Sequence, residues 1–184
     1  KPQGRMKISR NRTKTIYAGI LLGIHFALFF QAIKITNIAN ATFLGTLAPF
    51  FTLLIEMYFL NRGYDKRIII GLLFTFIGSI VIFSYDLNLQ STYTLGNIYA
   101  ILCSLCLAIA FMIAEKVREN ENTIVYTRTL YLSAAGTLLF IACILNENLI
   151  QYTPYEYLGL LFLGIVPTII GHNSIYYAVK YVSP

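Results

Sequence analysis

Long apolar stretches separated by short polar connectors dominate the pattern of hydrophobic and polar positions along the chain. Six such stretches occupy residues 16–33, 39–60, 68–84, 96–114, 124–145 and 156–179. A helix needs about 20 apolar residues to cross roughly 30 Å of hydrocarbon, and the stretches come close to that length, although 68–84 needs flanking residues. Backbone groups in lipid must bond within their own segment, and the stretches lack the alternation of barrel strands. We therefore predict an all-α integral membrane protein, a polytopic bundle of about six transmembrane helices.

Composition and charge narrow the classes of protein to which the chain can belong. Of its 184 residues, 57% are hydrophobic and 12% are charged, whereas soluble domains carry about 25% charged residues. Bases outnumber acids fourteen to eight, but six of the fourteen bases lie within residues 1–14. A nucleic-acid-binding domain would spread its bases over a folded surface. We therefore expect the lipid bilayer, and no nucleic acid, as a partner.

The distribution of bases among the connectors predicts how the chain is oriented. If residues 1–14 are cytoplasmic, successive crossings place most of the remaining bases on the same side: Arg62, Lys66, Arg67, Lys116, Arg118 and Lys180. The connectors around Asp86 and Glu147 then lie outside. Because cytoplasmic connectors carry an excess of Lys and Arg, we predict a multi-pass protein of the cell inner membrane with residues 1–15 as a basic cytoplasmic segment.

Two segments near opposite ends of the chain are similar to each other. Residues 29–34 read Phe-Phe-Gln-Ala-Ile-Lys, and residues 175–180 read Ile-Tyr-Tyr-Ala-Val-Lys. Both have an aromatic side chain second, and both end in Ala, an aliphatic residue and Lys. The first segment leaves its span toward the outside and the second toward the inside. Related segments that cross in opposite directions are typical of an inverted-repeat transporter.

Five runs, through their order and spacing, carry a resemblance to a known family. They are residues 23–36 (GIHFALFFQAIKIT), 41–52 (ATFLGTLAPFFT), 71–82 (GLLFTFIGSIVI), 96–100 (GNIYA) and 164–180 (GIVPTIIGHNSIYYAVK). In this order they resemble helices three, four and five, the start of helix six, and helix eight of the EamA-type permeases in the drug/metabolite transporter superfamily.

This resemblance implies a fold of ten helices in two five-helix repeats, of which the chain would hold helices three to eight as a fragment of a longer protein. The implied division places three helices of the first repeat in residues 16–84, a connector in 85–95 and three helices of a truncated second repeat in 96–184. An odd number of helices per repeat makes the two repeats cross the membrane in opposite directions. One departure is that residues 59–62 read Phe-Leu-Asn-Arg, where the family usually has Leu-Gly-Glu-Arg, so no role of that carboxylate can be transferred.

Polar side chains and prolines within the spans are candidates for a substrate pathway, because polar groups are costly inside a membrane. The candidates are His25, Gln31, Pro49, Thr52, Glu56, Asn97, Pro167, His172, Asn173, Tyr176 and Tyr177. Pro49 and Pro167 would each interrupt a helix and free a carbonyl for a ligand, with a purely structural kink as the alternative. Asn173, Tyr176 and Tyr177 could offer hydrogen bonds and aromatic faces to a flat or zwitterionic metabolite.

Glu56 is the acid placed well inside a predicted span. Small and polar residues recur at steps of three or four along the same helix and share one stripe with it: Ala41, Gly45, Pro49, Thr52 and Glu56. One interpretation is that Glu56 binds and releases protons to drive transport. The alternative is close helix packing, in which Glu56 extends to the cytoplasmic surface or pairs with a base in a connector or with Arg128.

The remaining chemistry of the sequence predicts no enzyme, no cofactor and no metal site. His25 and His172 lack a third ligand for a metal, and a helix–helix hydrogen bond is the alternative to proton transfer for each of them. Cys103 and Cys106 form a C-x-x-C within an apolar run, where they are expected to act as small apolar side chains. Motifs of nucleophilic catalysis, zinc proteolysis and phosphate binding are missing from the sequence.

These observations together predict a secondary transporter, a permease or exporter, that moves a small metabolite across the inner membrane by alternating access. Its expected partners are the lipid bilayer and a small-molecule substrate, with protons and a second copy of the chain, as a homodimer, as further candidates. The alternatives are a non-transporting membrane scaffold, whose polar groups would serve only helix contacts, and an intramembrane enzyme, which would need acid, base or metal ligands gathered at one depth.

Overall fold

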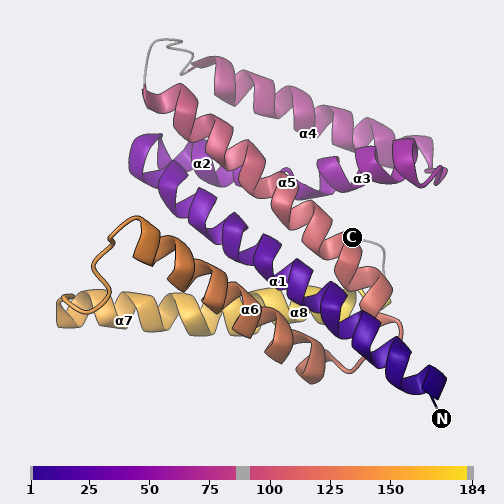
Figure 1. Cartoon of the computed structure of the whole chain (residues 1–184). Coiled ribbons are helices and arrows are strands. Elements are labelled where there is room, and N and C mark those ends of the chain that lie inside the picture. Colours follow the sequence, from indigo (N-terminus) through magenta and orange to yellow (C-terminus); the bar gives the residue numbers. More distant parts are fainter. Residues whose placement is uncertain (1, 86–91, 182–184) are drawn as a thin grey trace. The chain divides into compact units, whose positions relative to one another are not determined.

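Helices make up the architecture of the protein. The computed structural model describes residues 2–85 and 92–181, with side chains at 11–78, 80–81 and 93–181, and no β-strand occurs in these ranges (Figure 1). In chain order the helices are α1 (Pro2–Ile35), α2 (Ile38–Gly45), α3 (Ala48–Phe59), α4 (Lys66–Tyr85), α5 (Thr92–Arg118), α6 (Thr123–Ile144), α7 (Pro154–Leu163), the π-helix η1 (Gly164–His172) and α8 (Asn173–Ala178). The predicted fold class, an all-α polytopic membrane protein, is confirmed.

Within the described residues, five segments are long and apolar enough to cross a membrane. They are Asn11–Ile35, Ile38–Phe59, Tyr93–Arg118, Thr123–Ile144 and Pro154–Ala178. α4 matches the predicted span at 68–84, and its 20 residues would rise by about 30 Å. Since the side chains of 79 and 82–85 lie outside the described residues, its role as a span stays a prediction. The connector around Asp86 also lies outside them.

The chain divides into two compact units, which are described separately below. The middle unit comprises Ile24–Ile109, and the terminal unit comprises Lys1–Gly23 together with Ala110–Pro184. α1 and α5 are therefore each divided between the two units. Because α1 begins at Pro2, the backbone of the expected basic segment continues directly into the first span.

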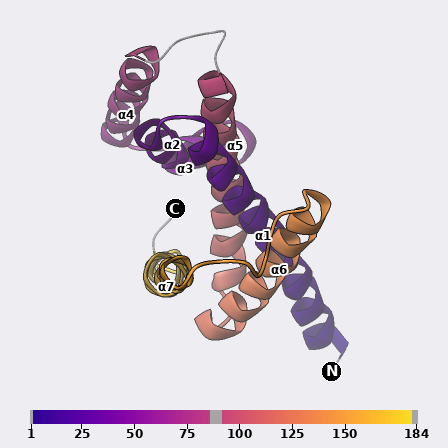
Figure 2. The same ribbon diagram turned by 90° about the vertical axis from the view of Figure 1, so that its left-hand side faces the viewer.

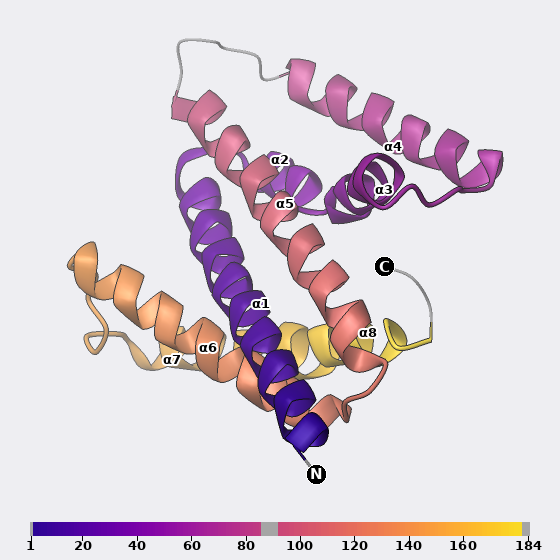
Figure 3. The same ribbon diagram turned by 45° about the vertical axis from the view of Figure 1, so that its right-hand side comes forward.

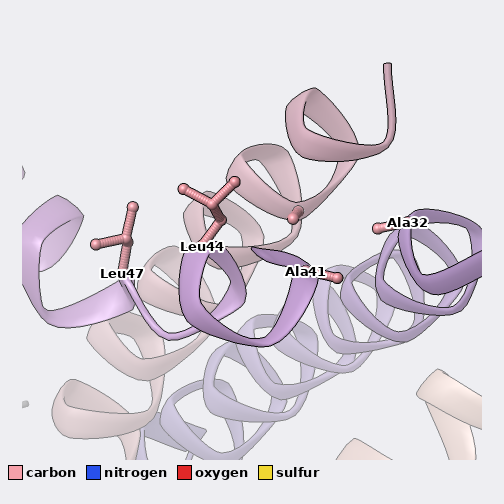
Figure 4. Close-up of a cluster of buried hydrophobic side chains, with 5 residues drawn as sticks. Ala32, Ala41, Leu44 and Leu47 are labelled. Carbon is pink, nitrogen blue, oxygen red and sulfur yellow. The ribbon is translucent and has the colours of Figure 1, made fainter. Parts of the chain in front are cut away.

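Small side chains let the helices of the middle unit approach closely. Its buried core consists of Ala32, Ala41, Leu44, Leu47 and Ala100. Figure 4 shows Ala32 of α1 facing Ala41 of α2, so the two helices meet through methyl groups. α4 lies beside α2 and α3 (Figure 3), where Phe76 of α4 stacks on Phe50 of α3 with ring centroids 4.8 Å apart.

The terminal unit contains a close contact between α1 and α6. Gly19 and Gly23 form a G-x-x-x-G pair on α1, and Cβ atoms added there would lie 2.5 Å from the Cβ of Ser133 and 2.7 Å from that of Thr137. Such small residues allow membrane helices to come into backbone contact. α7, η1 and α8 follow one another as a rod that Figure 2 shows end-on, and α8 packs against α6.

Candidate functional site

The second apolar segment is broken into two helices, so the interruption expected near Pro49 is present, a few residues earlier in the chain. α2 ends at Gly45, and α3 begins at Ala48 with Pro49 in its first turn. Proline has no N–H to donate to the carbonyl four residues earlier, but it is tolerated in the first turn of a helix. Pro49 therefore marks the start of a new helix, whereas the sequence analysis expected an interruption inside an existing one.

A hydroxyl group from α5 bonds to the backbone at this break. The Oγ of Ser104 donates a hydrogen bond of 2.6 Å to the carbonyl oxygen of Leu44, and Ser104 is fully buried. In lipid, the carbonyl groups at a helix end need partners, and that of Leu44 also accepts from the backbone N–H of Leu47 at 3.3 Å. Sequence reasoning missed Ser104, because a lone serine in an apolar helix usually bonds only to its own preceding turn.

The predicted stripe of small and polar residues changes at the break. Ala48, Thr52 and Glu56 of α3 are buried, whereas Pro49 is exposed. These three buried residues follow one another at steps of four, so Ala48 occupies the place on the stripe that was expected for Pro49. The stripe is confirmed for α3 with this one correction.

Glu56 forms an ion pair with Arg62 from the connector that follows α3. A nitrogen of the Arg62 guanidinium donates to the Glu56 carboxylate at 2.6 Å, with side chains that are 40% and 2% exposed. Asn61 has a positive φ of 50°, which asparagine tolerates better than most residues, and it turns the chain back toward Glu56. The pairing of Glu56 with a connector base, one of the two alternatives, is thus observed.

Two polar contacts join α1 to α5 within the middle unit. The Nδ1 atom of His25 lies 3.0 Å from the carbonyl oxygen and 3.0 Å from the Sγ of Cys103. The hydroxyl of Thr36 donates to the side-chain oxygen of Asn97 at 2.8 Å. His25 and Asn97 are buried, so both serve the helix–helix contact that was the alternative interpretation of His25. Gln31 is half-buried on α1.

The last span is distorted around Pro167. Pro167 lies inside η1, the π-helical stretch, and the Thr168 hydroxyl donates to the carbonyl oxygen of Leu163 at 2.9 Å. The helix continues through Pro167 in π form, so the expected interruption is present as a local distortion and not as a break, and π-helical turns are frequent at functional sites. From α6, the hydroxyl of Tyr131 lies 3.2 Å from the carbonyl oxygen of Thr168 and 3.0 Å from the side-chain oxygen of Asn173.

Arg118 is buried, although the sequence analysis counted it among the bases of an exposed connector. It is the last residue of α5, and its side chain is 1% exposed. Its Nε donates to the carbonyl oxygen of Tyr176 at 3.1 Å, while Nη1 donates to the carbonyl oxygen of Glu121 and Nη2 to the hydroxyl of Thr123. A basic residue after an apolar run gives no sequence signal for such burial.

Aromatic side chains surround Tyr176 next to this arginine. Ring centroids of Phe111, Tyr126 and His172 lie 5.6, 5.5 and 6.4 Å from that of Tyr176. Tyr126 and Tyr176 are fully buried, and their hydroxyl groups have no hydrogen-bond partner among the described residues. Tyr177 is 58% exposed.

The candidate residues thus fall into two sets, one in each unit. The set in the middle unit contains His25, Gln31, Pro49, Thr52, Glu56 and Asn97, and the set in the terminal unit contains Pro167, His172, Asn173, Tyr176 and Tyr177. That both sets line one cavity stays a prediction. Among the described residues, no three His, Cys, Asp or Glu side chains are placed to hold a metal together.

Comparison with known proteins gives consistent matches. A profile of the EamA-like transporter family matches residues 3–84 and again residues 94–184. The chain is 26% identical over 151 residues to the pseudopaline exporter CntI of Pseudomonas aeruginosa, a match that covers 80% of this chain and 51% of that protein. It is 24% identical over 132 residues to an uncharacterised transporter of Synechocystis, covering 68% of this chain and 37% of that protein.

The chain therefore spans about half the length of the curated relatives that it matches most extensively. No solved structure matches the chain significantly.

Proposed function

The chain belongs to the EamA-like transporter family, and from that premise we propose that it forms part of a secondary transporter that moves a small metabolite by alternating access. A transporter of this kind needs spans that can change shape near the middle of the membrane. Each segment matched by the family contains one interrupted span: the α2–α3 break lies within residues 3–84, and η1 lies within residues 94–184. This pair of interruptions is the observation that supports the proposal most strongly, since discontinuous helices form the substrate sites of many transporters.

The substrate pathway that we propose follows these interruptions. Thr52 and Glu56 lie on α3, after the α2–α3 break. Asn173 and Tyr177 lie on α8, which follows η1 directly. The amide, carboxylate and hydroxyl groups of these residues suit a polar metabolite. Glu56 is the proposed proton-binding group, in which case its ion pair with Arg62 must open during the transport cycle.

Direction, location and repeat structure are also part of the proposal. One relative is named as an exporter, which favours outward movement. The distribution of bases favours the inner membrane with the basic N-terminal segment in the cytoplasm. The two family matches, at 3–84 and 94–184, favour two related repeats, which opposite crossing directions would make an inverted pair.

Flux measured on the intact protein in proteoliposomes tests this function. We expect time-dependent counterflow of at least one compound from a panel of amino acids, nucleosides and vitamins. Asn173→Ala should raise KM for that compound, because the amide lies at the distorted span, whereas Asn148→Ala in an exposed connector should leave KM unchanged. Protein-dependent flux for none of these compounds would contradict the proposal.

Labelling of single cysteines in intact cells tests the orientation. In a version without native cysteines, a cysteine at Glu147 should react with an impermeant maleimide, and one at exposed Lys116 should react only after the cells are opened. The reverse pattern would invert the proposed topology without affecting the family assignment.

A further inference from the structure

The guanidinium of Arg118 is a buried charge of the terminal unit that has no ion-pair partner among the described residues. Its three hydrogen bonds go to neutral oxygens, namely the carbonyl groups of Tyr176 and Glu121 and the hydroxyl of Thr123. Among the described residues no carboxylate lies within ion-pair distance of Arg118, and that of Glu121 interacts with it only at longer range. A cation buried near a membrane without a paired anion is costly and usually has a function.

Two phenol groups beside this guanidinium are also unsatisfied. The hydroxyl groups of Tyr126 and Tyr176 are buried without hydrogen-bond partners among the described residues. The rings of Tyr126 and Tyr176 lie 5.5 Å apart, and the Arg118 guanidinium donates to the carbonyl oxygen of Tyr176, so the three residues form one cluster. An unpaired buried hydroxyl is destabilising, so in a native fold it calls for an explanation such as a bound partner.

The unused groups of this cluster are hydrogen-bond donors, which defines what they can bind. A guanidinium has five N–H donors, of which the Nε–H and one hydrogen on each Nη are used. One N–H on each Nη remains, together with the two phenol O–H groups. Such a set of donors requires an acceptor. A carboxylate fits it best, because a guanidinium binds carboxylates through two parallel hydrogen bonds.

The net charge of the cluster selects between a carboxylate and a phosphate. Arg118 supplies the positive charge that is buried there, since Lys116 and Lys180 are exposed, and the carboxylate of half-buried Glu121 lies beyond ion-pair distance. A single buried cation balances a monoanion, whereas a phosphate dianion would leave negative charge uncompensated in a buried site.

We propose that Arg118, Tyr126 and Tyr176 form a recognition site for the carboxylate of the transported metabolite. This inference rests on the proposed function and adds to it a substrate class, the monocarboxylates, together with the residues that select it. Tyr176 lies one helical turn after the end of η1, and its backbone carbonyl already accepts a hydrogen bond from Arg118. Binding of a carboxylate therefore acts directly on the distorted span.

Acetate serves as the probe, and acetamide serves as its neutral counterpart of nearly the same shape. The intact protein is purified in detergent, and its thermal unfolding midpoint Tm is followed while each compound is added at constant ionic strength. A ligand that binds the folded state raises Tm in a saturable way. We expect a saturable rise with acetate and none with acetamide. Equal responses to both compounds, or no response to acetate, would overturn the inference.

Tyr126→Phe and Tyr176→Phe are the decisive variants, because each removes an unpaired hydroxyl and keeps the bonds of Arg118. We expect their Tm without acetate to be unchanged or higher, and their affinity for acetate to fall about 10-fold or more, as for the loss of a hydrogen bond to a charged group. Tyr155→Phe at an exposed position of α7 is the matched control and should bind acetate normally. Unchanged affinity in both variants would refute the site.

Arg118→Gln and the flux assay complete the test. Arg118→Gln should abolish the acetate response, whereas Arg128→Gln, which removes an exposed arginine from α6, should retain it. If the intact protein transports a metabolite and the two Tyr→Phe variants keep its KM, the function stands and the carboxylate site is wrong. If acetate binding follows the expected pattern but no compound is transported, the site stands and the proposed function is wrong.

Discussion

Two spans of this protein are interrupted, and their surroundings differ. The α2–α3 break lies in a segment whose most apolar window is 44% buried, whereas the corresponding window of the segment containing η1 is 0% buried. Around the first break Leu44, Leu47 and Ala48 are all buried. No residue of α7 or η1 is buried.

The difference indicates which forces maintain each interruption. The buried break has side chains packed on it and a bond from Ser104, so tertiary contacts can hold it in place even if the local sequence changes. The hydroxyl contacts of the exposed π-helix come mostly from its own span, from Thr168 and Ser174, with one from α6, by Tyr131 to Thr168, and the π-helix therefore depends chiefly on its own sequence. For Pro167 the cause is local, because proline cannot donate to the ladder of helix hydrogen bonds.

Replacement of each of the two prolines should change the free energy of unfolding by very different amounts. Pro167→Ala restores a backbone donor inside η1 and should stabilise the protein by about 3 kcal/mol, while converting the π-helix to an α-helix. Pro49→Ala should change stability by less than about 1 kcal/mol, since proline fits the first turn of α3. Unfolding in mixed micelles measures the free energy. A persistent π-helix in Pro167→Ala would show that neighbouring helices impose it.

Enlarging an alanine should distinguish the packed region from the exposed one. Ala100→Leu inserts extra carbon atoms into the core beside the break and should destabilise the protein by about 2–3 kcal/mol. Ala178→Leu on the exposed side of α8 is the matched control and should stay within about 0.5 kcal/mol of the original protein. Equal effects in the same unfolding assay would show that the core around the break is loosely packed.

The two units also differ in how they accommodate a buried charge, which a double-mutant cycle can test. Arg62→Gln removes the ion-pair partner of buried Glu56 and should cost about 2 kcal/mol, less than for a fully buried pair because Arg62 is 40% exposed. The double variant with Glu56→Gln should recover most of the loss. Additive effects of the two substitutions on unfolding would mean that the pair contributes no coupling.

Removal of the hydroxyl contacts should produce the smallest differences. Ser104→Ala leaves the carbonyl of Leu44 without its side-chain donor and should destabilise the protein by about 1.5 kcal/mol. Tyr131→Phe, at a half-buried position, should cost about 0.5 kcal/mol. Hydrogen exchange of the amides next to each interruption would locate the effect. A larger loss for Tyr131→Phe would reverse the contrast between the two regions.

The sequence predicted the positions of the helices well, because apolar length alone determines where a membrane helix can form. The predicted range 96–114 lies within α5, and the predicted range 124–145 matches α6 to within one residue at each end. It also predicted an interruption at Pro167 and a polar stripe ending at Glu56. It also predicted an interruption near Pro49, but not that Pro49 lies in the first turn of a new helix, because a proline in an apolar run is compatible with either a kink or a new helix start.

The fold class, the approximate spans and the family follow from local composition and ordered motifs in the sequence. Which polar groups are satisfied depends instead on how the helices pack. Arg118 ends its helix like an ordinary connector base, and Tyr126 and Tyr176 are 50 residues apart in the chain. They form one cluster because α5, α6 and α8 meet there. Burial and hydrogen bonding depend on which helices meet, and the periodicity of a single helix contains no information about its neighbours.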